Sequence, residues 1–294
     1  MSNERKSEIN GMNLLYCGDQ NIQDGLLISI LSLLKHGSDE LHIYVMTMEL
    51  HTAQKDYHAI PDRTISFLNQ LVQRTNRNSF VKKYDCTALF KRQIPQKNMG
   101  TRFTPYAMLR LFADQLPDLP AKLLYLDSDV VCRQDPREFY HQDITDVELV
   151  GVLDYYGRWF FHHSLTHLDY INSGVLLLNM EKIKQTKLFE RARERCVKRW
   201  MFMPDQSALN KLAQAKRIAP RKYNEQHQLH ADTVFQHFTT SFKFFPLFKI
   251  QTIKPWEVQQ VHDVLGIHEY DDILNEYQQL VPNLANKKAN KNEK

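Results

Sequence analysis

Residues 122–131, Lys-Leu-Leu-Tyr-Leu-Asp-Ser-Asp-Val-Val, form an apolar run that is interrupted by two carboxylates. Such a run is typical of a strand that is buried on both faces of a parallel sheet. Side chains two residues apart in a strand share a face, so Asp127 and Asp129 would point the same way. Two like charges this close repel each other unless a cation neutralises them, and oxygen ligands suit Mg²⁺ or Mn²⁺. We therefore predict a metal site at this pair, although Asp-x-Asp also occurs by chance on loops.

Apolar patterns along the chain predict strands that alternate with helices. The expected strands are 13–17, 41–46, 80–84, 122–131, 149–153 and 173–179, and the expected helices are 24–35, 62–74, 105–115, 181–200, 205–213 and 271–279. This alternation predicts an α/β fold, with a Rossmann-like, mostly parallel sheet and helices on both faces. Ligands bind such sheets beyond the carboxyl ends of the strands, where both the Asp19 turn and the carboxylate pair fall.

Charge and cysteine usage narrow the class of protein. The net charge is only +4 and no recognition module is present, which argues against binding to nucleic acid. The four cysteines have neither a CxxC pair nor a Cys/His ligand spacing, which argues against a zinc site and fits a reducing compartment. The N-terminus has no apolar run of signal-peptide length, so we expect a cytoplasmic protein.

Basic residues gather in two places, the helix predicted at 181–200 and the C-terminal tail. The tail lysines are Lys287, Lys288, Lys291 and Lys294. Both segments would suit contact with the anionic inner face of a membrane. A solvated helix face and a free tail explain the same charges equally well.

Several further segments with polar residues follow one another in a fixed order around the carboxylate pair. They are Leu15-Tyr-Cys-Gly-Asp-Gln-Asn21, Phe103-Thr-Pro-Tyr-Ala-Met-Leu-Arg-Leu111, Gly151-Val-Leu-Asp154, Tyr170-Ile-Asn-Ser-Gly-Val-Leu-Leu-Leu-Asn179, Met203-Pro-Asp-Gln-Ser-Ala-Leu-Asn210 and Val234-Phe-Gln-His-Phe238. In this order, from about Asn13 to Trp256, they resemble the family 8 glycosyltransferases. These are retaining sugar-nucleotide enzymes with the GT-A fold, and they include glycogenin and bacterial lipopolysaccharide glucosyl- and galactosyltransferases.

The resemblance implies where a UDP-sugar donor would bind. Cys17, through its backbone, Asp19 and Asn21 would contact the nucleoside, and Ser128 would lie near the ribose. Arg110 would contact the sugar hydroxyls or the phosphate. Taken alone, the first motif is equally an ordinary Asp/Asn turn, and Arg110 is equally a solvated residue on a helix.

The later motifs imply contacts to the donor sugar and the reaction centre. Asp154 and Asn172 would contact the sugar. Asp205 and Gln206 would lie closest to the anomeric carbon. Pro204-Asp205 is also a favourable helix start, and both roles are compatible.

The resemblance adds His237 to Asp127 and Asp129 as the third metal ligand. It also implies a lysine for the diphosphate, and here the chain departs from the family pattern. Spacing after the histidine selects Lys243, which we favour slightly, whereas the local sequence Lys-Pro-Trp selects Lys254. Both candidates stay open.

The implied organisation has four parts. We expect residues 1–11 to be disordered, residues 12–280 to form a single GT-A domain and residues 281–294 to form a basic tail. Within the domain, 12–131 would be the nucleotide-binding half and 132–280 the donor and acceptor half.

The implied activity is retaining transfer of glucose or galactose from a UDP-sugar, with Mn²⁺ or Mg²⁺. The acceptor would be a hydroxyl of a cell-surface polysaccharide, a glycolipid or a glycoprotein glycan. Two alternatives are a non-catalytic sugar-nucleotide-binding protein and a self-glycosylating protein like glycogenin. The motifs do not distinguish glucose from galactose.

Overall fold

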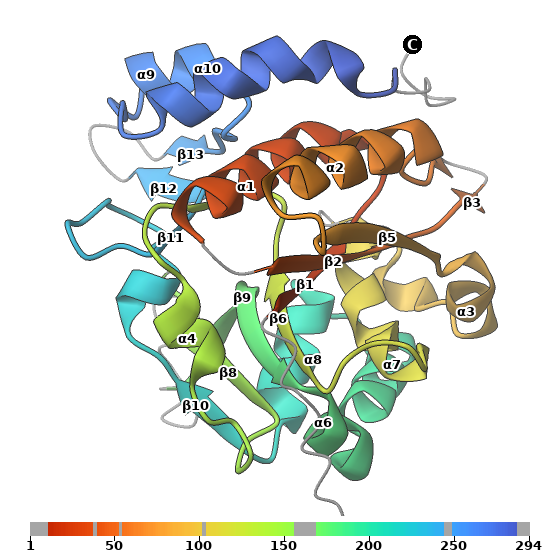
Figure 1. Cartoon of the computed structure of the whole chain (residues 1–294). Coiled ribbons are helices and arrows are strands. Elements are labelled where there is room, and N and C mark those ends of the chain that lie inside the picture. The colour runs from red at the N-terminus through yellow and green to blue at the C-terminus, as the bar shows by residue number, and fades with distance from the viewer. Residues whose placement is uncertain are drawn as a thin grey trace, which may run out of the picture.

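A seven-stranded sheet runs through the centre of the molecule in this computed structural model (Figure 1). The structure describes residues 11–37, 40–52, 55–101, 104–155, 169–243 and 249–286, with the backbone alone for 241–243 and 249–251. The strand order is β10-β8-β9-β6-β1-β2-β5. The strands span Gly11–Cys17 (β1), Glu40–Thr47 (β2), Phe80–Asp85 (β5), Lys122–Leu126 (β6), Leu149–Leu153 (β8), Ile171–Asn179 (β9) and Lys216–Ile218 (β10).

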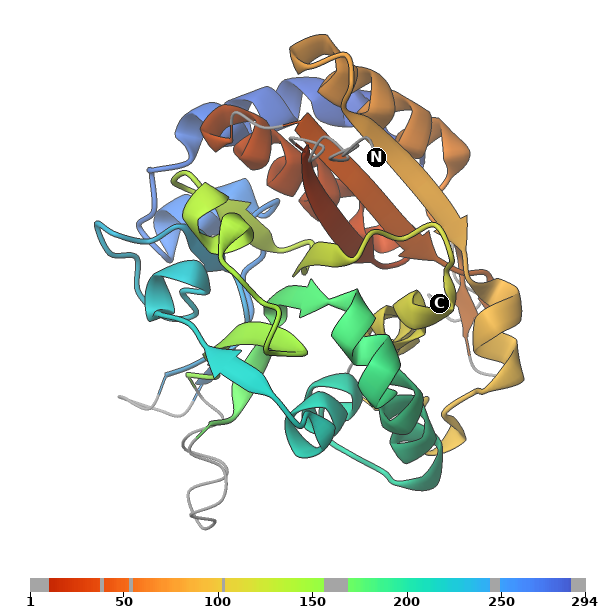
Figure 2. The same ribbon diagram turned by 60° about the horizontal axis from the view of Figure 1, so that its bottom comes forward.

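The sheet is mostly parallel, as predicted. Strand β1 pairs in parallel with β2 and β6, β2 with β5, and β8 with β10. Strand β9 alone is reversed, and it lies between β6 and β8. Figure 2 shows the two edge strands, β5 and β10, on opposite sides of the sheet.

Helices cover both faces of the sheet, as predicted for the GT-A fold. In β1, Leu14 and Tyr16 pack with the apolar side chains of α1 (Gln23–His36) and α2 (Asp62–Thr75), whereas Leu15 packs on the opposite side. That opposite layer contains the 3₁₀ helix η3 (Pro105–Gln115), α7 (Leu188–Lys198) and α8 (Pro204–Leu212). Helix α10 (Asp271–Leu280) packs on the outside of α1 (Figure 1).

The apolar run 122–131 is not one strand, so that prediction was wrong. Strand β6 ends at Leu126, and the chain turns through Asp127–Asp129, where the amide of Val130 donates to the carbonyl of Asp127 at 3.1 Å. Strand β7 (Val130–Cys132) then pairs with β11 (Phe235–His237) in a separate two-stranded sheet. Both strands are buried, so their apolar sequences hide the change of sheet.

The helix predicted at 181–200 is two helices, α6 (Met180–Thr186) and α7. Lys187 separates them in the left-handed conformation, with φ of 55°. This conformation costs a non-glycine residue about 1 kcal/mol. The predicted helix 105–115 has the expected bounds but is a 3₁₀ helix.

Short elements that were not predicted complete the fold. They are β10 and β11, already described, and η1 (Gln20–Ile22), β3 (Leu50–His51), β4 (Asp56–Tyr57), α3 (Thr87–Arg92), η2 (Gln96–Asn98), α4 (Arg137–His141), η5 (Arg221–Tyr223), β12 (Ser241–Lys243), β13 (Lys249–Gln251), α9 (Val258–Asp263) and η6 (Val281–Asn283).

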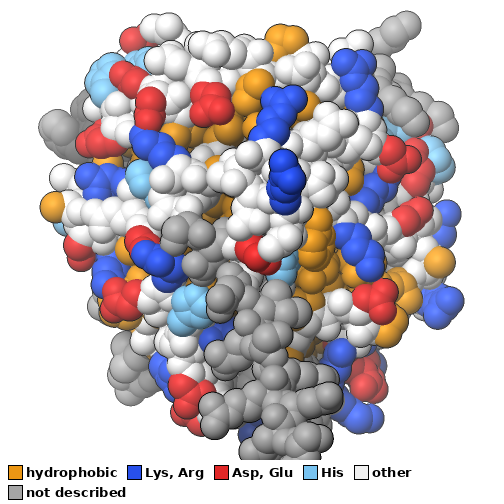
Figure 3. Space-filling model, viewed as in Figure 1, with side chains coloured by type: hydrophobic (Ala, Val, Ile, Leu, Met, Phe, Trp, Pro, Cys, Tyr) orange, Lys and Arg blue, Asp and Glu red, His pale blue; other side chains and the backbone are white. Residues whose placement is uncertain are grey.

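The predicted terminal segments fall mostly outside the described residues. This is so for residues 1–10 and for the tail lysines of 287–294, while Gly11 already belongs to β1. The sheet takes strands from both sides of residue 131, and the proposed split there stays a prediction. Among the described residues, no helix combines the length and apolar character needed to cross a membrane. On the face shown in Figure 3, acidic and basic side chains are interspersed.

Candidate active site

A cavity of about 430 Å³ opens where β1, β6 and β8 end, which is the edge at which α/β sheets bind ligands. Its size is in the range of small-molecule sites. The predicted site residues that line it are Cys17, Arg110, Asp127, Ser128, Asp129, Asp154, Asn172, Asp205, Gln206, His237 and Lys254. Residues from eight separate stretches of the chain are thus brought to one place.

Two carboxylates and one imidazole converge on the floor of this cavity. His237 Nε2 lies 3.7 Å from Asp127 Oδ2 and 3.3 Å from Asp129 Oδ1. The three ligand atoms all lie within 4.8 Å of one another. The pairing of β7 with β11 sets Val130 beside His237 and so carries the imidazole to the turn that holds the carboxylates.

The other polar atoms of these three side chains are already bonded. Asp127 Oδ1 accepts hydrogen bonds from Arg110 Nη2 at 3.0 Å and from the Tyr125 hydroxyl at 2.5 Å. Asp129 Oδ2 pairs with the ammonium group of Lys254. The remaining oxygens and His237 Nε2 face one another, and this donor set suits a divalent cation such as Mn²⁺.

Asn224 orients the imidazole from behind. Its Nδ2 donates to Asn172 Oδ1 at 3.0 Å, so its Oδ1, 3.3 Å from His237 Nδ1, acts as the acceptor. His237 Nδ1 therefore carries a proton, and Nε2 points at the carboxylates. A partner that fixes the ligating nitrogen in this way is typical of metal-binding histidines.

The charges of the cluster shift one another's pKa values. Burial acts to raise the pKa of Asp129, but Lys254 and His237 outweigh it and hold that pKa below its usual value. Burial acts to lower the pKa of His237, but the charge of Asp129 outweighs it and the pKa lies above 6.5. In the absence of a metal, the imidazolium and the carboxylate thus stabilise each other.

Arg110 links the metal-ligand candidates to the predicted reaction centre. It is only 3% exposed, and its guanidinium lies 3.9 Å from the centre of the Tyr125 ring. Its Nη2 bonds Asp127, while its Nε lies 3.3 Å from Asp205 Oδ2. Burial raises the pKa of Asp205, and the charge of Arg110 opposes that rise. The alternative of a solvated Arg110 is therefore wrong.

A second network holds the residues predicted for the donor sugar. Asp154 Oδ2 accepts from Gln206 Nε2 at 2.9 Å and from Asn172 Nδ2 at 3.1 Å. Gln206 Oε1 accepts from the backbone amide of Ser173 at 2.9 Å. The side chain of Gln206 is thereby fixed at both ends, next to Asp205 in the first turn of α8.

The predicted nucleoside turn is organised locally. Asp19 accepts from the backbone amide of Asn21 at 2.9 Å and from its side chain at 3.0 Å, and it caps η1. Burial raises the pKa of Asp19 above its usual value. Neither residue lines the cavity, whereas Cys17 and Gly18 do. The contacts of Asp19 and Asn21 to a nucleoside therefore stay predictions.

The two lysine candidates differ in what the structure describes of them. Lys254 lines the cavity, and its ammonium group also donates to the carbonyl of Phe238 at 3.1 Å. Lys243 ends β12, and its side chain lies outside the described parts of the chain. The assignment of Lys243 by spacing therefore stays a prediction.

Several residues that shape the site had no role predicted from the sequence. They are Tyr125, which bonds Asp127, Ser173, which holds Gln206, Asn224, which orients His237, and Trp256, which lines the cavity. Tyr125 and Ser173 lie inside the ordered motifs and Trp256 lies in Lys-Pro-Trp, so their positions could have marked them as site residues. Asn224 had no such signal, because it is a single amide in a segment without periodicity.

Comparison with known proteins gives a match to "Glycosyl transferase family 8" over residues 13–258. A lipopolysaccharide 1,2-glucosyltransferase of Escherichia coli is 27% identical over 249 residues, which cover 75% of this chain and 69% of that protein. The protein of that name from strain K12 is 26% identical over 226 residues, and the match covers 72% of this chain and 62% of its length.

Solved structures share the fold at lower sequence identity. The galactosyltransferase LgtC, in complex with donor and acceptor sugar analogues, superposes with a TM-score of 0.64 at 16% identity, over 94% of this chain and 98% of its own. The glycosyltransferase GlyE of Streptococcus pneumoniae TIGR4 gives a TM-score of 0.59 at 18% identity, over 95% of this chain and 66% of its own.

Proposed function

Because the chain belongs to glycosyltransferase family 8, we propose that this glycosyltransferase transfers glucose or galactose from a UDP-sugar to a glycan hydroxyl, with retention of configuration. The observation that carries the proposal is the convergence of Asp127, Asp129 and His237 beside Asp205 and Gln206 in one cavity. A cluster of buried, charged groups in a cleft of ligand size is a usual property of active sites.

The carboxylates and the imidazole would hold Mn²⁺ or Mg²⁺. Such an ion neutralises negative charge on a leaving diphosphate. Lys254, whose ammonium group already lies beside Asp129, supplies a second positive charge at the same end of the cavity. Positive groups that are held in place before the reaction, where negative charge develops in the transition state, usually account for a large part of the rate enhancement.

The donor sugar would lie between the metal site and the Asp154–Gln206–Asn172 network. Each of these side chains is buried and held by the others, so the contacts to sugar hydroxyls are arranged before the donor binds. Retention can proceed through a nucleophile on the protein or by front-side displacement. For the first route Asp205 is a better candidate than Gln206, because a carboxylate is a stronger nucleophile than a neutral amide oxygen.

A panel of UDP-sugars with Mn²⁺ tests the activity. The assay measures UDP release with and without EDTA, with lactose and other oligosaccharides as acceptors. We expect release from UDP-glucose or UDP-galactose that EDTA abolishes. Asp127→Asn and Asp129→Asn should each lower it by at least about 100-fold. Asp118→Asn, which alters an exposed carboxylate paired with Lys82, is the matched control.

Three readouts separate the alternatives. Absence of UDP release from every UDP-sugar, with Mn²⁺ bound, would favour a non-catalytic binder. A gain of hexose mass on the protein itself would favour self-glycosylation. The anomeric configuration of the product, followed by NMR, tests retention.

A further inference from the structure

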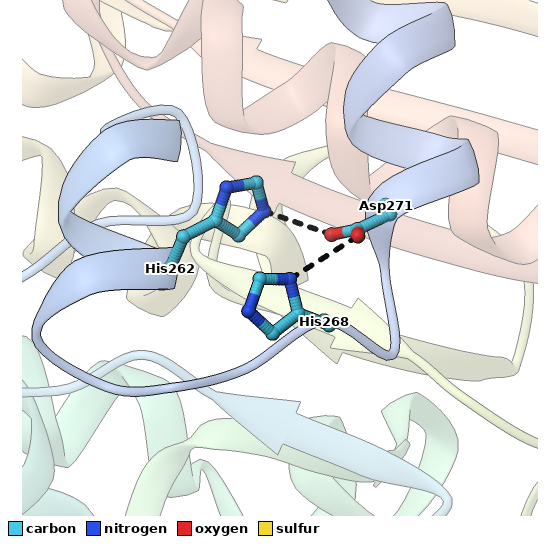
Figure 4. A group of neighbouring side chains, drawn as sticks. All are labelled: His262, His268 and Asp271. Carbon is cyan, nitrogen blue, oxygen red and sulfur yellow. Dashed lines mark hydrogen bonds and ion pairs between the residues drawn. The ribbon is translucent and has the colours of Figure 1, made fainter.

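A second group of metal-ligating side chains lies outside the cavity, where α9 leads into α10. His262 is in the last turn of α9, His268 is in the connecting loop, and Asp271 is the first residue of α10 (Figure 4). None of the three lines the cavity. The catalytic proposal assigns them no role.

The two imidazoles converge on one carboxylate. His262 Nε2 lies 2.8 Å from Asp271 Oδ1, and His268 Nδ1 lies 3.2 Å from Asp271 Oδ2. The rings are stacked, with centroids 4.7 Å apart and an angle of 18° between their planes. The three ligand atoms lie within 4.8 Å of one another. Tetrahedral zinc with ligands near 2.1 Å separates neighbouring ligand atoms by about 3.4 Å, so small shifts would form the site.

The backbone of the loop holds this arrangement in place. Gly266 adopts φ of +64°, and its amide donates to the carbonyl of His262 at 3.0 Å. Ile267 donates to the carbonyl of Val261 at 3.2 Å, which folds the chain back over the end of α9. The amide of Asp271 donates to the carbonyl of His268 at 3.2 Å. The imidazoles are therefore brought together by the turn and not only by their shared carboxylate.

The site is also open to an ion. The side chains of His262, His268 and Asp271 are 26%, 65% and 44% exposed, so a metal could enter from solvent and keep one position for water. We propose that His262, His268 and Asp271 bind a borderline dication such as Zn²⁺. Two imidazoles and one carboxylate suit zinc, nickel or copper, whereas Mg²⁺ prefers oxygen ligands alone. The sequence lacks the cysteine-containing spacings of common zinc sites, but this group needs no cysteine.

A metal here would fasten α9 to α10. Helix α10 is anchored to α1, since the Tyr277 hydroxyl donates to Asp24 Oδ1 at 2.8 Å. Helix α9 begins two residues after Trp256, which lines the cavity. The bound ion would thus stabilise the segment that carries one wall of the cavity, without taking part in the reaction.

Zinc titration of a variant without the cavity carboxylates tests the proposal. The background is the full chain with Asp127→Asn and Asp129→Asn, stripped with EDTA and dialysed, so that neither catalysis nor the cavity metal contributes. We expect one Zn²⁺ per chain by isothermal titration calorimetry. At a free Zn²⁺ concentration 100 times Kd, the Tm of the protein should rise by about 5 °C. Co²⁺ in place of Zn²⁺ should give the visible absorption of a four-coordinate site.

His262→Gln, His268→Gln and Asp271→Asn in this background should each weaken Zn²⁺ binding by at least about tenfold. His51→Gln is the matched control, because His51 is another exposed histidine bonded to an aspartate, at 3.0 Å from Asp56, and it should bind like the background. Far-UV circular dichroism checks that each variant is folded. Equal Zn²⁺ affinity in the background and in the His268→Gln variant, or no stoichiometric binding at all, would overturn the proposal.

Discussion

The ammonium group of Lys254 pairs with the carboxylate of Asp129, which lies 125 residues earlier in the chain. A dication bound to Asp129 would lie next to this ammonium group, and the two positive charges would repel each other. Lys254 therefore occupies the place of a counter-ion in the metal-free protein.

This competition predicts opposite effects of Lys254→Met on metal binding and on turnover. Without nucleotide, Mn²⁺ should bind about tenfold more tightly, since a like charge is removed. If Lys254 contacts the donor diphosphate as proposed, UDP release should fall by about 100-fold, because a charge that would stabilise the leaving group is lost. Calorimetry and the UDP assay measure the two effects. Lys82→Met, at an exposed ion pair, is the control, and unchanged Mn²⁺ affinity in Lys254→Met would contradict the prediction.

The raised pKa of His237 predicts how the stability of the metal-free protein depends on pH. A group whose pKa is higher in the folded state contributes its full stabilisation below its unfolded pKa, near 6.5, and loses it as pH rises through the folded value. The free energy of unfolding of wild type, relative to His237→Asn, should therefore decline as pH rises above 6.5. Urea unfolding in EDTA at pH 6 to 9 measures this difference, and a difference independent of pH would refute it.

The same proton competes with a metal for His237 Nε2. Mn²⁺ affinity of the wild-type protein should therefore increase over the pH range in which the stability difference declines. Calorimetry at each pH provides the measurement. In His237→Asn, Mn²⁺ should bind weakly, and its affinity should no longer show the increase with pH that is due to loss of the His237 proton.

Removal of Arg110 should damage both stability and activity. Arg110→Met would leave Asp127 and Asp205 without their shared buried cation, which predicts a loss of about 3 kcal/mol in the free energy of unfolding. Arg110→Lys keeps the charge but cannot contact Asp127 and Asp205 through separate nitrogens, so its loss in the free energy of unfolding should be smaller than that of Arg110→Met. Urea unfolding compares both with Arg137→Met at an exposed ion pair, which should change by less than about 0.5 kcal/mol. A similar loss in Arg110→Met and Arg137→Met would disprove this role.

Gly174→Ala should disrupt the metal site through crowding alone. A methyl group at Gly174 would lie within 3.0 Å of both His237 and Asp127 Oδ2. We expect Mn²⁺ binding to fall by at least about tenfold, because ligands displaced by even 1 Å lose their geometry. Gly100→Ala is the matched control, since nothing lies within 4 Å of the added carbon there. Normal Mn²⁺ affinity in Gly174→Ala would show that the ligands do not converge as described.

Sequence patterns predicted six of the seven strands of the central sheet, most of which are largely buried, but not the short and partly exposed edge strand β10. Strands such as β2 and β9 each contain an apolar run of four residues, and their positions followed from the sequence to within two residues. The same property concealed the change of sheet after Leu126, since β7 is as apolar as β6. The break at Lys187 carried no glycine or proline to mark it.

The candidate site could be assembled from ordered motifs, but its supporting contacts could not. Asn224 acts through the three-dimensional neighbourhood of His237, which no local pattern encodes. The lysine ambiguity has a similar cause. Strands β12 and β13 pair antiparallel, with Ser241 opposite Gln251. The chain therefore reverses direction between the two strands, and the ammonium group of Lys254 lies beside Asp129. The number of residues after His237 therefore does not by itself decide between the two lysines.

The reversed strand β9 has a consequence for a chain that emerges from the ribosome. It pairs on one side with β6 and on the other with β8, both of which are synthesised before it. The strands on the β6 side of the sheet therefore cannot be joined to those on the β8 side until residues 171–179 have been made. Pairings between segments that are distant in sequence also form slowly. His237 and Lys254 are synthesised later still. A growing chain thus lacks the complete group of Asp127, Asp129 and His237, and any metal held by these three residues would bind only after most of the protein has been translated.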